Sequence, residues 1–359
     1  RKIRDACRRG IGRHCRDDRE DTNMSGSTYG DIGQRTAVYA EVEMLEHARP
    51  IIVLSDYGQS KPLPKNKAEQ VKFRRPIPYL VSTTQLIEGV TPTSHKTRYA
   101  DVPVTIGQYG DVAEITDKVA DLAEDPVLRD MSMLSGEQAA ETIEMVTWGV
   151  IKGGSNVIYA AAADTVRTDV NDPMTLNTQR ASTKFLKAQR GKKITSKMSS
   201  SVQYGTEAVD AAYLAFGHTD LESDIRDMTG FTPTEKYGSM KPLPFECGKV
   251  EDVRYILSPL LEPFVDSGAA VGSSGMVTSG TLVDVYPIVM IAKEAYGLVP
   301  LRGAGAIHPT VLNPGTVSKS DPLGQRGYVG WKTWFVAVVL NQAWMVRIEV
   351  GATDLSPVL

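Results

Sequence analysis

Between Tyr57 and Asp117, apolar and polar residues alternate with a period of two, which is typical of β-strands. The apolar positions of the two series are Val71 and Phe73, then Val102, Val104 and Ile106. Three prolines keep these strands out of the centre of a sheet, because proline cannot donate a ladder hydrogen bond. They are Pro76, Pro78 and Pro103. We therefore predict a long two-stranded ribbon whose tip, Ser82 to Asp101, is polar. A lone ribbon buries little surface, so we expect it to lie across a neighbouring subunit.

A long amphipathic helix is predicted from Asp125-Pro126 to Gly153-Gly154. Aspartate is a good N-cap, proline is favoured at the first helical position, and glycine commonly follows a helix end. The expected buried stripe is Leu128, Met131, Leu134, Ala139, Ile143, Val146 and Val150. Glu137, Glu141 and Glu144 are expected to lie largely off that stripe. At 1.5 Å per residue, the helix would be roughly 40 Å long.

Two shorter helices are predicted further along the chain. The first begins at Asp172-Pro173 by the same capping logic, buries Leu176, Phe185 and Leu186, and ends with basic residues before Gly191. The second follows an apolar strand, Tyr213 to Gly217. Its expected features are a capping box formed by Thr219 and Glu222, an apolar face of Leu221, Ile225 and Met228, and a left-handed stop at Gly230.

The rest of the chain is less regular. Thr36 to Ala48 has helical character, and Ser267 to Gly280 is rich in Gly and Ser without periodicity, which predicts a mobile loop. Near the end, Trp344, Val346, Ile348 and Val350 alternate with less apolar neighbours. We expect the segment Tyr328 to Val350 to return as strands that pair with the domain of the long helix.

Several long motifs resemble those of tailed-phage major capsid proteins. Residues 218–244 read HTDLESDIRDMTGFTPTEKYGSMKPLP, and residues 248–263 read GKVEDVRYILSPLLEP. Further motifs are STYGDIGQRTAVYAEVEMLEHARP, GQSKPLPKNKAEQVKFRR, LSGEQAAETIEMVTWGVIKGGSNVIYA and DPLGQRGYVGWKTWFVAVVLNQAWMVRIEV. Together they resemble the major capsid proteins of N-four-type phages over nearly the whole stretch from Met24 to Leu355. None of these motifs is catalytic.

The resemblance implies an α+β fold of the Hong Kong 97-like type. Its expected parts are an N-terminal arm (24–56), an extended β-ribbon loop (57–117), a peripheral domain with a long spine helix (118–201 and 328–355) and an axial domain (202–327). The implied function is structural. Hexamers and pentamers of the chain would form an icosahedral virion shell that encloses double-stranded DNA without sequence-specific binding, after assembly in the host cytoplasm. Portal, scaffold and decoration proteins are the implied partners.

Two other classes of protein remain open at this point. An encapsulin-like compartment that houses a cargo enzyme would use the same fold. A soluble α/β enzyme is the third possibility, but the sequence offers no paired acid and base, nucleophile or cofactor loop to support it.

Composition is that of an ordinary soluble protein, with 42% hydrophobic and 23% charged residues and a net charge of −3. This charge argues against a protein whose main surface binds nucleic acid. No apolar run approaches the roughly 20 residues needed to span a bilayer, and we expect neither a membrane association nor a secretory signal. Three cysteines, Cys7, Cys15 and Cys247, make no disulfide framework, which favours a reducing compartment.

The first 23 residues differ from the rest, with eight Arg or Lys and five Asp or Glu among few apolar residues. We interpret them as a disordered extension that is not native to the protein. The alternative is a basic arm that touches packaged DNA.

No arrangement of residues predicts catalysis, a cofactor or a metal. His218 with Asp220 and Glu222 is explained by helix capping, and the spacing of Cys7, His14 and Cys15 fits no zinc pattern. Cys247 lacks a nucleophile motif that would pair it with His218 or His308. A phosphate-binding Walker loop is absent, and Gly268, Gly272 and Gly275 do not match a dinucleotide fingerprint.

A basic run accompanies the predicted ribbon. Its members are Lys61, Lys65, Lys67, Lys72, Arg74 and Arg75. One interpretation is a solvated strand edge that resists unwanted pairing. The other is a set of weak salt bridges to a neighbouring subunit, in which Lys72, Arg74 and Arg75 would meet Glu137, Glu141 and Glu144. Each exposed pair would contribute on the order of 0–1 kcal/mol.

Overall fold

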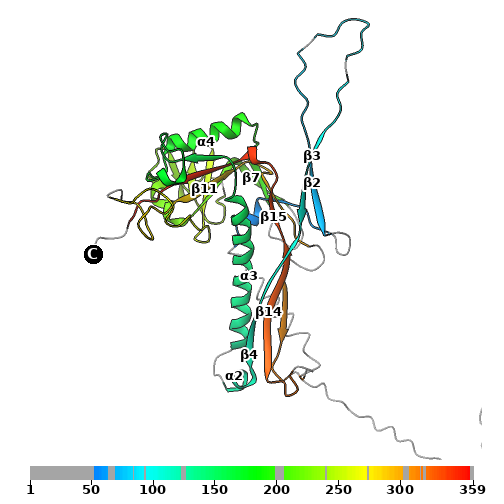
Figure 1. Ribbon diagram of the computed structural model, residues 1–359, viewed down its shortest axis with the longest axis vertical. Helices are drawn as coiled ribbons and strands as arrows, with labels where there is room; N and C mark the ends of the chain where they lie inside the picture. Colours follow the sequence, from blue (N-terminus) through cyan, green and yellow to red (C-terminus); the bar gives the residue numbers. More distant parts are fainter. Residues whose placement is uncertain are drawn as a thin grey trace, which may run out of the picture.

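The computed structural model describes most of the chain after residue 51. The described ranges are 52–63, 69–83, 85–92, 94–122, 127–198, 206–238, 241–272, 275–301, 307–315, 317 and 321–355. A compact domain carries a long helix that projects from it beside a long sheet, and a separate ribbon extends in the opposite direction (Figure 1). The predicted helix at 36–48 and the basic segment 1–23 lie outside the described residues.

An eight-stranded sheet forms the centre of the compact domain. In sheet order its strands are β5 (Val157–Tyr159), β16 (Met345–Val350), β11 (Tyr286–Ile291), β7 (Thr206–Gly217), β10 (Val253–Leu257), β9 (Glu246–Val250) and β8 (Phe231–Pro233), with β6 (Ile194–Met198) beside β7. The pairs β7–β10 and β5–β16 are parallel, and the other pairs are antiparallel. Every residue of β10 and β11 is buried, as expected for strands that are covered on both faces.

The two faces of this sheet belong to two separate cores. On β7, Leu214 and Phe216 pack with Trp148 of the long helix, whereas Tyr213 and Ala215 pack on the other side. Because successive side chains of a strand point to opposite faces, one apolar run supplies both cores. The far face is covered by α4 (Leu176–Ala188) and by the turn at η4 (Thr219–Leu221) and α5 (Glu222–Arg226).

The long helix is α3 (Val127–Ile151), which confirms the predicted spine. It follows the short α2 (Asp117–Leu122) and lies along β13 (His308–Leu312), β14 (Arg326–Phe335) and β4 (Gly107–Thr116) (Figure 1). Strand β14 pairs with β4 over the full length of both. Gln138 fixes the helix to this sheet, since its amide donates to Asp111 (2.7 Å) and its carbonyl accepts from the Trp331 indole (3.1 Å).

The predicted buried stripe of α3 was partly wrong. Leu134 is 63% exposed, while small residues fill the contact face. These are Ser132, Ser135, Gly136, Ala139 and Ala140. Small side chains let the helix approach the sheet closely, so this face does not show up as an apolar pattern.

The caps of the shorter helices also differ from the prediction. α4 begins three residues later than Asp172-Pro173 implies, because Thr175 is its N-cap and accepts a hydrogen bond from the Thr178 amide. At η4 the cap is His218, whose Nδ1 accepts from the Asp220 amide (3.2 Å), and the predicted capping box does not form. The buried face of Leu221, Ile225 and Met228 and the left-handed Gly230 are confirmed.

The C-terminal segment lies deeper than expected. Strand β16 pairs with β5, as predicted for a return to the domain of the long helix, but also with β11 in the middle of the sheet. Five of its six residues are buried, so the expected alternation fails. The irregular segment at 267–280 is held at its start by Asp266, whose carboxylate accepts from the Thr281 and Leu282 amides.

The remaining elements are short. They are η2 (Leu54–Asp56), β1 (Gln59–Ser60), β2 (Gln70–Pro76), β3 (Tyr99–Thr105), η3 (Arg167–Asp169), η5 (Thr234–Lys236), β12 (Tyr296–Leu298), β15 (Ala337–Val339) and η6 (Gln342–Trp344).

A buried ion pair links β9 to β10 near the sheet edge. The side chains of Arg254 and Glu246 are 2% and 0% exposed and lie 2.6 Å apart. Glu246 also accepts from the Tyr237 hydroxyl and from the Leu243 amide, each at 2.7 Å. Removal of one partner from such a pair leaves an uncompensated buried charge.

We expect Arg254→Met to lower the free energy of unfolding by about 3–5 kcal/mol, because Glu246 would remain charged and buried. The double variant Arg254→Met, Glu246→Gln should recover a large part of this loss, since no buried charge remains. Urea denaturation at neutral pH measures both. A single variant as stable as the wild type would show that the pair is not desolvated.

Candidate intersubunit surfaces

The base of the ribbon is fixed to the molecule on one face. Strands β2 and β3 pair from Gln70↔Thr105 to Pro76↔Tyr99, which confirms the predicted two-stranded ribbon. Val71 and Phe73 are buried against the small sheet of β1, β12 and β15. Gly297 makes room for this contact: a Cβ there would lie 2.9 Å from the Phe73 ring.

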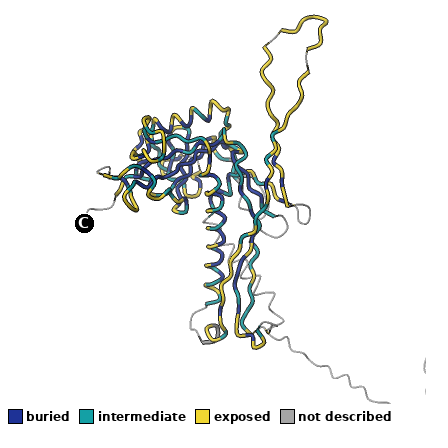
Figure 2. Tube along the Cα trace, in the orientation of Figure 1, coloured by how far each residue is buried: buried dark blue, intermediate teal, exposed yellow. Residues whose placement is uncertain are grey.

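Beyond the base, the connection at 77–98 protrudes from the molecule and is exposed along its described length (Figure 2). Among the described residues, the outermost backbone hydrogen bond across it runs from the Ile77 amide to the Arg98 carbonyl (2.9 Å). The prediction of a polar tip was incomplete, because large apolar side chains are exposed along this connection, both within the predicted tip and just before it. Their exposed fractions are Tyr79 57%, Leu80 90%, Val81 77%, Leu86 77%, Ile87 71% and Val90 60%. Such a concentration of exposed apolar surface marks a site of contact with another molecule.

Two of the three ribbon cations already have partners inside the chain. Arg74 forms a bidentate pair with Asp101 on the opposite strand, at 2.8 and 3.0 Å, and this pairing raises the pKa of the guanidinium. Arg75 stacks over the Trp344 ring at 5.7 Å. Lys72 is exposed, and its carbonyl accepts from the Lys61 ammonium (2.7 Å). Lys65 and Lys67 lie outside the described residues.

The three glutamates of α3 do not share one environment. Glu141 is exposed and Glu137 is half-buried. Glu144 is completely buried, so the expectation that it lies off the buried stripe was wrong. Its carboxylate accepts from the Leu54 amide at 2.9 and 3.2 Å, and a contact with another subunit would require that bond to break.

Glu144 forms part of a buried clamp that holds η2 to α3. The Tyr296 hydroxyl donates to the Leu54 carbonyl on the other side of the same residue, and Asp56 lies near enough to repel the Glu144 charge. Burial raises the pKa of Glu144 to about 7, and burial likewise raises the pKa of Asp56 to about 6. Residues 54–56 are the last residues of the expected N-terminal arm (24–56). Neither Glu144 nor Tyr296 was recognised from the sequence as a fixing point, and no local pattern distinguishes them.

The groups considered for catalysis have structural surroundings. His218 packs against the Tyr286 ring at 5.5 Å, and Tyr286 donates to Asp220 (2.7 Å). Burial raises the pKa of Cys247 to about 11, which disfavours the thiolate that a nucleophile requires. Within the described part of the chain, no three His, Cys, Asp or Glu side chains gather in a way that would hold a metal, and no helix is long and apolar enough to cross a membrane. Cys7, His14 and Cys15 lie outside the described residues.

Solved structures with the same fold are capsid proteins. The chain resembles the capsid of Ralstonia phage GP4 with a TM-score of 0.64 and 12% identity, over 85% of this chain and 92% of that one. For the Cyanophage Pam1 capsid the TM-score is 0.53 and the identity 15%, over 86% and 92% of the two chains. For Cyanophage P-SCSP1u these values are 0.53 and 14%, over 84% and 89%. No curated protein matches the sequence.

The architecture is therefore the α+β, Hong Kong 97-like capsid fold, with its spine helix, mixed sheets and extended ribbon. A model of the phage capsid protein family matches residues 99–348, which is more than half of the chain. The chain belongs to this family. It is a major capsid protein, a structural component of the virion and not an enzyme.

Glu144→Gln should make the stability of the protein less dependent on pH. Because burial raises the pKa of Glu144 above its ordinary value, this group stabilises the fold fully at low pH, and that contribution is lost as the pH rises through about 7. The loss is on the order of 3 kcal/mol for a shift of this size. Glutamine keeps an acceptor for the Leu54 amide but has no proton to lose.

The measurement is the free energy of unfolding between about pH 5 and pH 8, with the exposed Glu141→Gln on the same helix as the control. We expect Glu144→Gln to exceed the wild type in stability at the alkaline end and Glu141→Gln to follow it. If Glu144→Gln is the less stable protein at the alkaline end, the carboxylate charge itself stabilises the clamp.

Proposed function

We propose that copies of this chain assemble as hexamers and pentamers that close into the icosahedral shell of a tailed phage around double-stranded DNA. The observation that carries this proposal is the protruding connection at 77–98. Its apolar side chains are exposed in the subunit although the base of the ribbon is firmly packed. Full burial of each such side chain contributes about 1.5–3 kcal/mol, so several together favour docking on a neighbour. Head-to-tail contacts of this kind close into rings when the rotation between subunits allows it.

The division of labour within the subunit is part of the proposal. Residues 24–56 would be the N-terminal arm, 57–117 the extended loop, 118–201 with 328–355 the peripheral domain, and 202–327 the axial domain. The clamp at Leu54 supports an arm whose last residues are fixed to α3. The amino-acid sequences of the motifs at 218–244 and 248–263 support membership of the N-four-type subfamily. Portal, scaffold and decoration proteins are the proposed partners.

Replacement of residues 79–97 by a short Asn-Gly turn should leave a folded subunit that cannot form shells. The deletion spares Val71, Phe73 and Val104, which are buried, and it keeps the pairing of β2 with β3. Electron microscopy and light scattering report assembly, and circular dichroism reports folding.

A matched pair of variants distinguishes the effect of the length of the connection from the effect of its apolar side chains. Leu86→Ser, Ile87→Ser keeps the length of the connection and removes exposed apolar surface, whereas Thr91→Ser, Thr97→Ser changes it little. Only the first should impair assembly. Shells formed by the shortened protein would refute the proposal, and wild-type shells filled with a foreign protein would indicate an encapsulin-like compartment.

The salt bridges between ribbon and helix remain a proposal for Lys72, Arg74 and Arg75 with Glu137 and Glu141. We do not extend it to Glu144, whose carboxylate is engaged inside the subunit. Lys72 and Glu141 are the simplest pair to test, since both are exposed.

In a double-mutant cycle, Lys72→Gln and Glu141→Gln should each weaken assembly at low salt. The loss of assembly free energy in the double variant should be smaller than the sum of the losses in the two single variants. Coupling on the order of 0–1 kcal/mol per contact is expected, and it should vanish at high salt. The measurement is the critical concentration for assembly at two ionic strengths. Strict additivity at both would show that the two residues do not meet.

A further inference from the structure

The outward face of α4 and the turn that follows it are strongly basic. Residues 176–193 contain six basic residues and no acidic one, although the chain as a whole carries −3. The six are Arg180, Lys184, Lys187, Arg190, Lys192 and Lys193. The first three recur at helical spacing, so they lie on one side of the helix. We call this set the α4 basic face.

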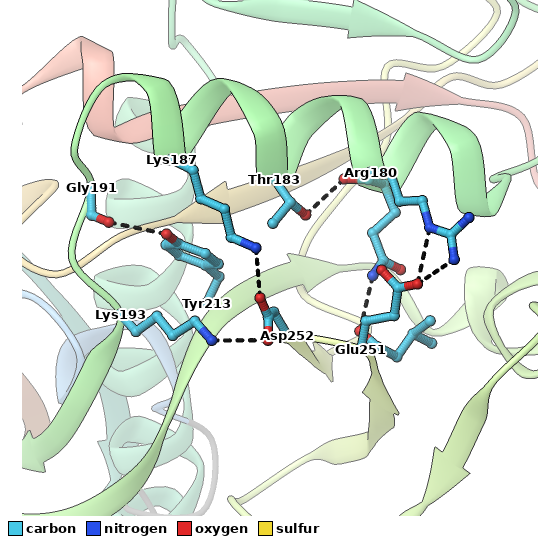
Figure 3. Close-up of polar contacts among 10 residues, drawn as sticks. Arg180, Thr183, Lys187, Gly191, Lys193, Tyr213, Glu251 and Asp252 are labelled. Atoms are coloured by element: carbon cyan, nitrogen blue, oxygen red, sulfur yellow. Dashed lines mark hydrogen bonds and ion pairs between the residues drawn. The ribbon is translucent and has the colours of Figure 1, made fainter.

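The opposite side of α4 is anchored to the central sheet. The Gln179 side chain is fully buried, donates to the Val250 carbonyl (2.9 Å) and accepts from the Tyr255 hydroxyl (2.7 Å). At the end of the helix, the Tyr213 hydroxyl donates to the Gly191 carbonyl (3.0 Å), as Figure 3 shows. The basic side chains are therefore held on a rigid support.

Two acidic residues on the turn between β9 and β10 neutralise part of this charge (Figure 3). Glu251 accepts from Arg180 (2.9 Å), and Asp252 lies between Lys187 (2.7 Å) and Lys193 (2.9 Å). Six cations less these two acids leave a net charge of +4. Lys184, Arg190 and Lys192 are exposed and form no ion pair with any residue that the structure describes.

The α4 basic face lacks what a protein–protein interface needs. Its other exposed positions are Asn177, Ala181, Ala188 and Gln189, and no large apolar side chain is exposed between residues 176 and 193. Interface cores are rich in aromatic residues and poor in lysine. A polyanion requires only a positive surface that its phosphates can approach, and small residues between the lysines permit that approach.

We propose that the α4 basic face binds the phosphate backbone of double-stranded DNA, independently of sequence. The proposal rests on the proposed function, since the DNA would be the genome enclosed by the shell. Lys184, Arg190 and Lys192 supply the cations that are free to replace condensed counterions. Arg180, Lys187 and Lys193, which Glu251 and Asp252 hold in place, define the shape of the surface.

The test uses the full-length subunit and a random-sequence duplex of about three helical turns (~30 base pairs), with fluorescence anisotropy over a range of salt concentrations. The variant is Lys184→Gln, Arg190→Gln, Lys192→Gln. Its control is Lys118→Gln, Lys236→Gln, Lys332→Gln, which removes three exposed charges elsewhere. Both proteins retain the basic residues at 1–23, so any difference between them reports on α4.

We expect the α4 variant to bind the duplex at least about tenfold more weakly than the control at low salt. Loss of three phosphate contacts should reduce the slope of log K against log salt by about 2.7. Equal affinities and slopes for the two variants would overturn the proposal. So would an α4 variant that binds DNA normally but no longer assembles, because the face would then contact another subunit. Assembly is scored separately by electron microscopy, so a failure of the shell proposal is distinguishable from a failure of DNA binding.

Discussion

The burial of both faces of the central sheet is the constraint on which the rest of the subunit depends. Strands β10 and β11 and the last part of β7 (212–217) have no solvent face, so each of these residues must meet a covering element. One cover is the upper end of α3 with residues 52–57, and the other is α4 with α5. The position of the spine helix, the attachment of the expected arm and the rigidity of the α4 basic face all follow from this double burial. A slip of one residue in β7 would exchange the two cores and misplace all three.

Outside that sheet, the described part of the chain leaves a large apolar surface exposed. The ribbon base is packed through Val71 and Phe73, yet its connection exposes Leu80, Val81 and Leu86 to solvent. Exposed apolar residues of this kind do not stabilise a monomer, and in a soluble protein they usually promote aggregation. They are explained if the folded unit is incomplete until a neighbour covers the connection, which is how a shell subunit differs from an enzyme of similar size.

Period-two alternation located β2 and β3, and glycine and proline boundaries located α3, because both signals depend on the local chain. The buried face of α3 could not be predicted, since Ser132, Ser135 and Ala139 are selected by the closeness of a sheet that is distant in sequence. The environment of Glu144 was missed for a similar reason: its partner Leu54, and Tyr296, which donates to the Leu54 carbonyl, lie far away in the chain. The His218 cap took the place of the expected capping box of Thr219 and Glu222. Both arrangements use hydrogen bonds between residues close in sequence, so the sequence pattern could not decide between them. The apolar residues of the ribbon connection were visible in the sequence, but only the structure shows that they are exposed to solvent.

The ribbon connection and the α4 basic face differ in the specificity that they require. The connection offers large apolar side chains, and apolar burial depends on a fitted partner surface, so it suits a neighbour whose position is fixed by symmetry. The α4 basic face offers charges on flexible stems over a rigid helix with no apolar centre, and long-range charge attraction requires no fitted partner. Packaged DNA presents phosphates in no fixed register to any one subunit, so only a surface of the second kind would bind it equally at every position in the shell. The separation of the two chemistries also protects assembly, because a basic face with an apolar centre would compete with the ribbon for the same neighbours.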